Sequence, residues 1–161
     1  LCKRKVLTGR VAFADELKKE CDEFLIKNLG ISAFTEDPKE KQLIRPFLVT
    51  YGTHLRRKLD KDCWIKKAEP LVGRFMEKKS IPVVTDVRFP NEADWVHSLG
   101  GYVIHIDREG FGPANEEEAE NEPILIDKSD ERVKWPTLGN PEIHKKKYID
   151  IVDKTIGGIF K

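Results

Sequence analysis

The pattern that most constrains the fold of this chain lies in residues 81–106. An apolar run over 81–85 is followed by helix-spaced apolar residues over 91–99, and then by a second apolar run over 102–106. Asn91 is a good N-cap for the intervening helix, and two glycines close it. Two strands joined by one helix through such short connections form a βαβ unit, which is parallel and right-handed in nearly all proteins. The pattern therefore predicts an α/β fold in which helices cover a mostly parallel sheet.

Helix and strand patterns also alternate through the rest of the chain. The apolar run over 11–14 predicts a buried strand, and Asp15 then stands where the N-cap of an amphipathic helix over 16–29 should be. An acidic stretch with five glutamates in eight residues predicts a mobile loop over 111–123. We expect further elements: a helix from Pro38 towards Gly52 that Pro46 kinks or splits, a helix over 64–76, a strand over 124–126 and a closing helix over 149–160.

Length and composition limit the classes of protein to which this chain can belong. The 161 residues predict a single domain that is long enough to bury a core. The 29 basic and 28 acidic side chains leave a net charge of +1, which argues against a nucleic-acid coat and a polybasic membrane anchor. No apolar run is long enough for a membrane span. Three cysteines without CxxC spacing exclude a disulfide framework or zinc knuckle, and favour a reducing compartment.

Charged residues follow three of the predicted strands, at the edge where ligands bind in open parallel sheets. Asp15 follows the first strand, Asp86 and Arg88 follow the second, and Asp107 and Arg108 follow the third. Carboxylates hold Mg²⁺ or orient a hydroxyl, and guanidinium groups bind phosphate oxygens in pairs. This mixture predicts a phosphorylated ligand with its metal.

Each of these residues also has a structural interpretation. Asp15 is explained about equally well as a helix cap, and an apolar run that ends at Asp86 is a weak pattern by itself. Arg88 is harder to explain structurally, because a cap in the tight turn before Phe89 would be Asn, Ser or Asp.

The basic stretch around Trp64 supports two interpretations. Arg56, Arg57 and Lys58 fit a solvated helix face, the commoner fate of such runs, and Trp64 fits a core position. Aromatic rings beside arginines are also how proteins stack a nucleobase. The four histidines show no metal-ligand spacing and accompany no Cys or Ser in a nucleophile motif, so covalent catalysis is not the leading mechanism.

Three segments of the chain carry a family resemblance. They are VAFADELK at 11–18, YGTHLRR at 51–57 with Trp64 beyond it, and TDVRFPNEA at 85–93, which is the most specific. In this order they resemble the P-loop deoxynucleoside monophosphate kinases of bacteriophages and, more distantly, the animal phosphomevalonate kinases. The resemblance covers roughly residues 1–108. It implies a P-loop kinase-like, three-layer αβα fold with a mostly parallel sheet.

The sequence departs from this family at its N-terminus. Such kinases open with a strand and a GxxxxGK[ST] loop that holds the β- and γ-phosphates. The 161 residues contain no such loop, and Gly9 alone does not make one. Either the loop lies upstream of Leu1, so that residues 1–5 end its helix, or the protein is a homologue that cannot hold ATP in the ordinary way. The missing Met and abrupt start favour the first, and a sheet without its central strand would have two unpaired edges.

The resemblance implies a nucleoside monophosphate kinase, acting on deoxynucleotides, that uses Mg²⁺ and transfers the γ-phosphoryl group of ATP to a 5′-monophosphate. It implies that the protein binds its nucleotide substrate and ATP, and that it binds neither nucleic acid nor membrane. It also implies a location in the cytoplasm, which is that of the host if the protein is viral. The resemblance leaves open whether the protein forms a homodimer. By this resemblance, Asp15 and Lys18 lie near the acceptor nucleotide, Arg56 and Arg57 bind its phosphate, and Trp64 forms a wall of the base pocket. Asp86 serves the metal or the phosphoryl path. Arg88 binds phosphate, and Arg108 lies against the adenine or the transferring group.

Two other functions stay open at this point. One is a non-catalytic nucleotide- or protein-binding module that lacks the phosphate loop. The other is a kinase of a different small phosphorylated metabolite, which would share the same site chemistry.

Overall fold

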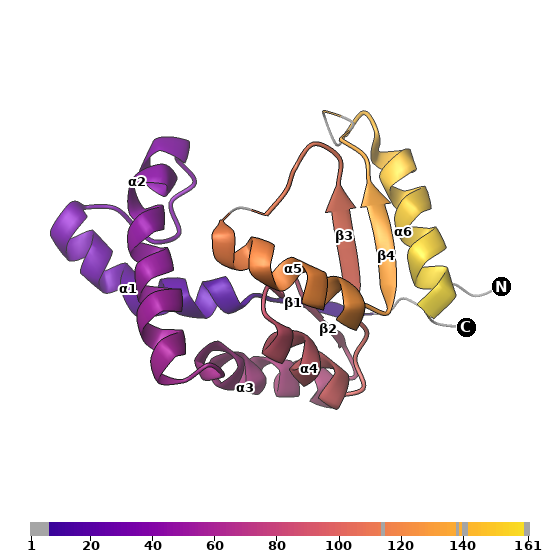
Figure 1. The fold of residues 1–161 in the computed structure, drawn as a ribbon, viewed down its shortest axis with the longest axis horizontal. Coiled ribbons are helices and arrows are strands. Elements are labelled where there is room, and N and C mark those ends of the chain that lie inside the picture. The colour runs from indigo at the N-terminus through magenta and orange to yellow at the C-terminus, as the bar shows by residue number, and fades with distance from the viewer. Residues whose placement is uncertain (1–6, 114, 138, 140–141, 160–161) are drawn as a thin grey trace. The chain divides into compact units, whose positions relative to one another are not determined.

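The computed structural model describes residues 7–113, 115–137, 139 and 142–159. The chain forms two compact units, Leu1–Val87 and Arg88–Lys161, here called the N-terminal and C-terminal units. Each unit combines helices with a two-stranded parallel sheet (Figure 1). The predicted α/β class is confirmed to this extent, and the three-layer arrangement stays a prediction. The helix end expected at residues 1–5 lies outside the described residues.

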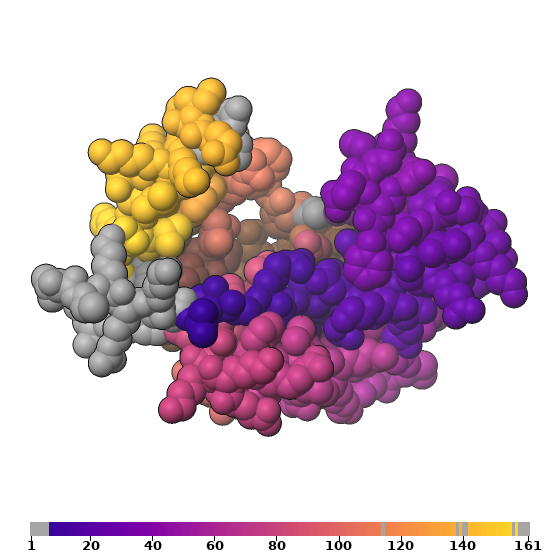
Figure 2. All heavy atoms as spheres, turned by 180° about the vertical axis from the view of Figure 1, so that it is seen from behind, coloured from indigo at the N-terminus to yellow at the C-terminus, as the bar shows by residue number. Residues whose placement is uncertain are grey.

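The N-terminal unit builds its core between helices and one short sheet. β1 and β2 pair in parallel, with Thr8 opposite Ile81 and Val11 opposite Val84. In Figure 2 the atoms of β1 and α1 lie directly against those of α3. Its elements are β1 (Thr8–Val11), α1 (Phe13–Leu29), α2 (Pro38–Val49), the π-helix η1 (Thr50–Arg57), α3 (Cys63–Glu77) and β2 (Ile81–Val84).

Gly9 lets α3 pack directly on β1. A Cβ atom added at Gly9 would lie 2.2 Å from Cε1 of Phe75, a ring of α3. No side chain fits at that distance, so the position needs glycine for close approach rather than for a phosphate-binding loop.

The start of α1 differs from the prediction. The apolar run over 11–14 is not a strand throughout, because β1 ends at Val11 and α1 begins at Phe13. Asp15 is not the N-cap but lies in the first helical turn. The N-cap is Ala12, whose side chain can accept no hydrogen bond. The free N–H groups of this helix therefore need a partner from elsewhere in the chain.

Pro46 does not split the second helix. Asp37 caps α2 by accepting the N–H groups of Lys39 at 2.8 Å and Glu40 at 3.1 Å. The helix runs through Pro46 to Val49, and the chain then widens into the π-helix η1 at Thr50. Such segments are rare and frequently occur at functional sites.

In the C-terminal unit, β3 pairs in parallel with β4 and α5 connects the two strands. Figure 1 shows α6 running alongside β4, and Trp135 of β4 stacks on Tyr148 of α6 with ring centroids 5.1 Å apart. The elements of this unit are α4 (Pro90–Ser98), β3 (Ile104–Arg108), α5 (Glu116–Lys128), β4 (Glu131–Trp135) and α6 (Lys145–Ile159). Among the described helices of the chain, none is long and apolar enough to cross a lipid bilayer.

The βαβ unit predicted over 81–106 has one strand in each of the two units, β2 and β3, so its pairing stays a prediction. Within the units, β2 pairs with β1 and β3 pairs with β4. The parallel crossover of the second sheet is made by α5. The strand expected over 102–106 begins two residues later, at Ile104.

The acidic stretch and the strand expected over 124–126 both fall within α5. The side chain of Asn115 caps this helix by accepting the Glu118 N–H at 2.9 Å. Glutamates in the first turn also interact favourably with the positive end of the helix dipole. The prediction of a loop and a strand here is therefore wrong, because the acidic run begins a helix.

Asp130 joins three parts of the C-terminal unit. Its Oδ2 accepts the N–H of Val103 at 2.7 Å and lies 2.9 Å from Nε2 of His97. Its own N–H donates to the Val103 carbonyl at 2.8 Å. Burial opposes ionisation of the carboxyl, but the hydrogen bonds from Val103 and His97 outweigh it and lower the pKa of Asp130 below its ordinary value of 3.8.

Replacing Asp130 with Asn should reduce the free energy of unfolding by about 1 kcal/mol at neutral pH, since hydrogen bonds to a partly exposed charge are of modest strength. A carboxyl with a lowered pKa in the folded state contributes stability above its unfolded pKa. The difference between wild type and D130N should therefore shrink as the pH falls below 3.8 and through the folded pKa. Urea unfolding at several pH values measures it, with the exposed Asp153→Asn as control. A difference that does not change with pH contradicts this account.

Candidate active site

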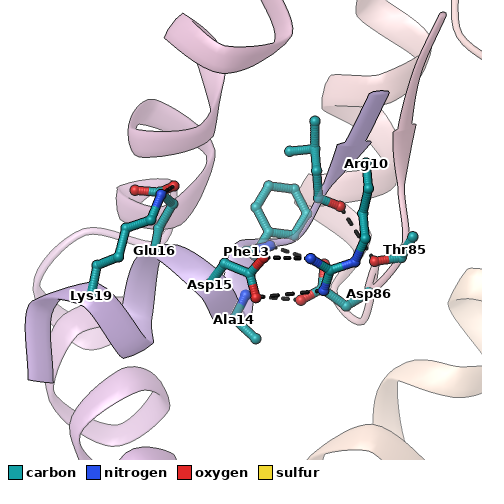
Figure 3. Close-up of polar contacts among 9 residues, drawn as sticks. Arg10, Phe13, Ala14, Asp15, Glu16, Lys19, Thr85 and Asp86 are labelled. Carbon is teal, nitrogen blue, oxygen red and sulfur yellow. Dashed lines mark hydrogen bonds and ion pairs between the residues drawn. The ribbon is translucent and has the colours of Figure 1, made fainter. Parts of the chain in front are cut away.

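Asp86 supplies the cap that the first turn of α1 lacks. Its Oδ1 accepts the N–H of Phe13 at 2.9 Å, and its Oδ2 accepts the N–H of Ala14 at 2.8 Å (Figure 3). The preceding residue, Thr85, donates its N–H at 3.0 Å and its hydroxyl at 3.3 Å to the Val11 carbonyl. The carboxyl ends of β1 and β2 are thus tied to the N-terminus of α1.

Arg10 and Asp15 form a two-pronged ion pair beside this cap (Figure 3). The Nη1–Oδ2 distance is 2.5 Å and the Nη2–Oδ1 distance is 3.5 Å. The bond to Asp15 and its charge raise the pKa of the Arg10 guanidinium, and Asp86 adds to this effect. The Arg10 side chain is 61 % exposed, so the guanidinium is accessible from solvent.

Lys18, predicted to lie near the acceptor, is one helical turn beyond Asp15 on α1. Its Nζ lies 5.5 Å from the centroid of the Phe34 ring, a cation–π contact. The structure therefore gives Asp15 and Lys18 different partners, although the helix carries both on neighbouring turns.

Arg56 and Trp64 lie together in the N-terminal unit. The Arg56 guanidinium carbon lies 5.8 Å from the centroid of the indole ring. Trp64 itself is only 4 % exposed, and its Nε1 donates to the Gly52 carbonyl at 3.2 Å. Arg56 thus covers a tryptophan whose ring belongs to the core.

Arg57 lies on the same π-helix, near a buried thiol. Burial raises the pKa of Cys63, and the charges of Arg56 and Arg57 oppose that rise. Burial, followed by the charge of Glu20, raises the pKa of the second described thiol, Cys21, to about 11. Both thiols are free and stay protonated at neutral pH, which agrees with a site that does not use a cysteine nucleophile.

Arg88 is held at the start of the C-terminal unit by two glutamates. Its side chain, 55 % exposed, pairs with Glu118 of α5. Its backbone N–H and that of Phe89 donate to Oε2 of Glu92 at 2.8 and 3.1 Å, and Glu92 is 2 % exposed. The N-cap of α4 is Phe89 rather than the predicted Asn91, because the Glu92 carboxylate reaches back to the free N–H groups.

Arg108 is the last residue of β3, and its guanidinium carbon lies 4.1 Å from the centroid of the Phe111 ring. The residues on either side of it, Asp107 and Glu109, line an open cavity of about 500 Å³. Lys134 and Trp135 at the end of β4 line the same cavity. The carboxyl edge of this second parallel pair is therefore hollowed and carries charges of both signs.

The described residues offer no ready-made metal cage, since no three His, Cys, Asp or Glu residues among them are grouped to hold an ion. Each Asp86 oxygen accepts one N–H bond and keeps a second lone pair. Mg²⁺ in phosphate-binding sites needs only one or two carboxylates besides the phosphates and waters. Asp86 therefore fits this limited role.

Two charged residues of this region were not found from the sequence. Arg10 lies in β1, where exposed and buried residues alternate, and nothing in this local pattern indicates its ion pair with Asp15. Glu20 contacts both Arg56 and Lys67, but in sequence it is one of many charges on a helix surface. Their partners became visible only with the tertiary structure.

Comparison with known proteins shows a family and a relative that the chain resembles. A family model described as "Deoxynucleotide monophosphate kinase" matches residues 2–131. A protein of Acanthamoeba polyphaga mimivirus, provisionally named a deoxynucleotide monophosphate kinase, is 35 % identical over 117 residues. That match covers 62 % of this chain and 61 % of the relative, so the chain spans less than two thirds of the relative's length. No solved structure matches the chain.

Replacing Asp86 with Ala should lower the free energy of unfolding by about 2 kcal/mol, because the first turn of α1 loses both of its carboxylate acceptors. D86N keeps one acceptor oxygen and should lose about half of that. Urea unfolding followed by circular dichroism gives the values.

The exposed Asp150→Ala on α6 is the matched control and should change stability by less than about 0.5 kcal/mol. A D86A protein as stable as D150A would show that the cap contributes nothing.

Proposed function

Because the chain belongs to the deoxynucleotide monophosphate kinase family, we propose that it transfers the γ-phosphoryl group of ATP to the 5′-phosphate of a deoxynucleoside monophosphate. The products are ADP and the deoxynucleoside diphosphate. Residues 2–131 match the family model and contain every residue to which a role is assigned below.

The observation that best supports this proposal is the charged carboxyl edge of the β1–β2 pair. Ligands of parallel sheets bind outside the carboxyl ends of the strands, where helix N-termini also point. In this unit that edge carries the accessible Arg10 guanidinium, the Asp15 carboxylate and the Asp86 carboxylate. This is the mixture that phosphoryl transfer requires, since positioning and charge neutralisation provide most of its catalysis.

In the proposed mechanism, arginines neutralise the phosphates and acids orient the reacting groups. Arg56 and Arg57 bind the acceptor phosphate, and Arg88 binds phosphate during transfer. Asp15 and Lys18 lie near the acceptor nucleotide, and Arg108 contacts ATP. Trp64 is only 4 % exposed, so its proposed part in the base pocket is to support Arg56, which lies over the indole ring, rather than to stack directly on the base.

Asp86 is the proposed ligand of Mg²⁺. When bound with ATP, the ion neutralises charge on the phosphate oxygens. The remaining lone pairs of the Asp86 carboxylate are the atoms available to it, while the hydrogen bonds from α1 fix the orientation of the carboxylate.

An ADP-release assay across deoxynucleoside and ribonucleoside monophosphates tests the proposal. With the full protein, Mg²⁺ and ATP, at least one deoxynucleoside monophosphate should stimulate ADP release. If phosphomevalonate alone stimulates release, the acceptor is a different metabolite. If no acceptor does so, the protein is a binding module rather than a kinase.

Replacing Arg88 with Ala should reduce kcat/KM for the monophosphate by at least about 100-fold, because a guanidinium on the transferring phosphate contributes that much or more. The Arg88 side chain is largely exposed, so circular dichroism should show an intact fold.

The exposed Arg74→Ala on α3 is the matched control and should leave turnover unchanged. Retained activity in R88A would remove Arg88 from the mechanism.

A further inference from the structure

Glu20 forms ion pairs with two cations of the N-terminal unit. Its Oε1 lies 3.3 Å from Nη2 of Arg56, and its Oε2 lies 3.7 Å from Nζ of Lys67. The phenol of Tyr51 is a third neighbour: burial first, and then the charge and hydrogen bonding of the Glu20 carboxylate, raise its pKa. The three partners come from two elements, η1 and α3, and Glu20 comes from a third, α1.

The π-helix explains how two of these partners reach one carboxylate. Tyr51 and Arg56 are five residues apart, and both lie within η1. Hydrogen bonds in a π-helix join residues five apart, so these side chains come onto the same face. In an α-helix, side chains share a face at spacings of three and four instead.

Arg56 is fixed on more than one side. Its guanidinium lies over Trp64, and its Nε is buried without a hydrogen-bond partner in the described part of the chain. Glu20 holds Nη2, while the side chain as a whole stays 31 % exposed. The guanidinium is therefore held by Trp64 and Glu20 while about a third of the side chain stays in contact with solvent.

Glu20 does not saturate the two cations with which it pairs. Arg56 and Lys67 share its one carboxylate, and the neighbouring Asp60, whose charge also acts on Arg56, is bonded to Lys66 at 2.7 Å. Both distances to Glu20 exceed the 2.7–2.9 Å that is typical of a strong charge-assisted bond. The two cations consequently keep hydrogen-bonding capacity for a second anion.

We propose that Glu20 is a positioning residue, which holds Arg56 and Lys67 in place for the phosphate of the acceptor nucleotide. The proposal rests on the proposed function and names the group that orients its phosphate-binding arginine. Glu20 does not itself touch the phosphate, since two anions would repel each other. Glu20 restricts the Arg56 side chain before the phosphate binds, so that less conformational entropy is lost on binding.

Steady-state kinetics of E20Q test this role. The Gln side chain has nearly the same shape but no charge, so Arg56 loses its anchor and KM for the monophosphate should rise about tenfold, with kcat little changed. E20D retains the charge and should recover part of the loss. The matched control is Glu23→Gln, an exposed glutamate three residues further along α1, which should behave as wild type.

A second measurement does not depend on turnover. In a protein whose other tryptophans, Trp95 and Trp135, are replaced by Phe, the emission reports on Trp64 alone. Acrylamide should quench Trp64 more strongly in E20Q than in E23Q, because Arg56 no longer covers the ring.

The outcomes separate this proposal from the proposed function. Unchanged KM and unchanged quenching in E20Q would overturn the positioning role, and tighter monophosphate binding would do so too, because Glu20 would then be a competitor of the phosphate. If the wild-type protein phosphorylates no monophosphate, the proposed function and the named ligand fail. The quenching result would then still show whether Glu20 holds Arg56.

Discussion

The interaction on which the N-terminal unit depends is the capping of α1 by a carboxylate from the other end of the unit. Ala12 cannot accept the free N–H groups of the helix, and Asp86 accepts two of them from the end of β2. Because β1 leads directly into α1, the same contact fixes the helix relative to both strands. It also brings Arg10 and Asp15 to the carboxyl edge of the sheet, where the candidate site lies.

Arg10, Arg56 and Arg88, three of the arginines considered for phosphate binding, each pair with an acid of their own unit. Arg10 pairs with Asp15, Arg56 with Glu20 and Arg88 with Glu118. Each pair is partly exposed, and exposed ion pairs contribute little to folding stability. Such pairs restrict the guanidinium groups to few conformations, which would lower the entropy lost on binding a phosphate, as proposed above.

The sequence predicted those features that depend on neighbouring residues. The strand at β2 and the helices α1, α3, α4 and α6 follow from apolar runs and helical spacing, which are local. The acidic start of α5 was predicted as a loop because composition was weighed above the Asn115 cap and the favourable position of acids at a helix N-terminus. The pairing of β1 with β2 and of β3 with β4 could not be predicted, because an apolar run indicates a buried strand but not which strand lies beside it.

In the candidate site, too, residues in local sequence patterns were predicted, and residues that depend on tertiary contacts were not. Asp15 and Arg56 were predicted because strand ends and basic clusters are visible in the sequence, and each forms an ion pair. Asp86, predicted in the same way, accepts two backbone N–H groups of α1. Glu20 was missed because its partners are more than thirty positions away in the sequence, on η1 and α3, and meet it only in the tertiary structure.

The width of η1 has a consequence for how this segment tolerates change. With the same residues in an α-helix, Tyr51 and Arg56 would be about 140° apart around the helix axis, because each residue turns the chain by about 100°. A substitution that favours the α-helix over the π-helix would therefore separate Arg56 from Tyr51 without replacing either residue. Variation in Thr50–Arg57 thus acts through the backbone as well as through the side chain that is replaced.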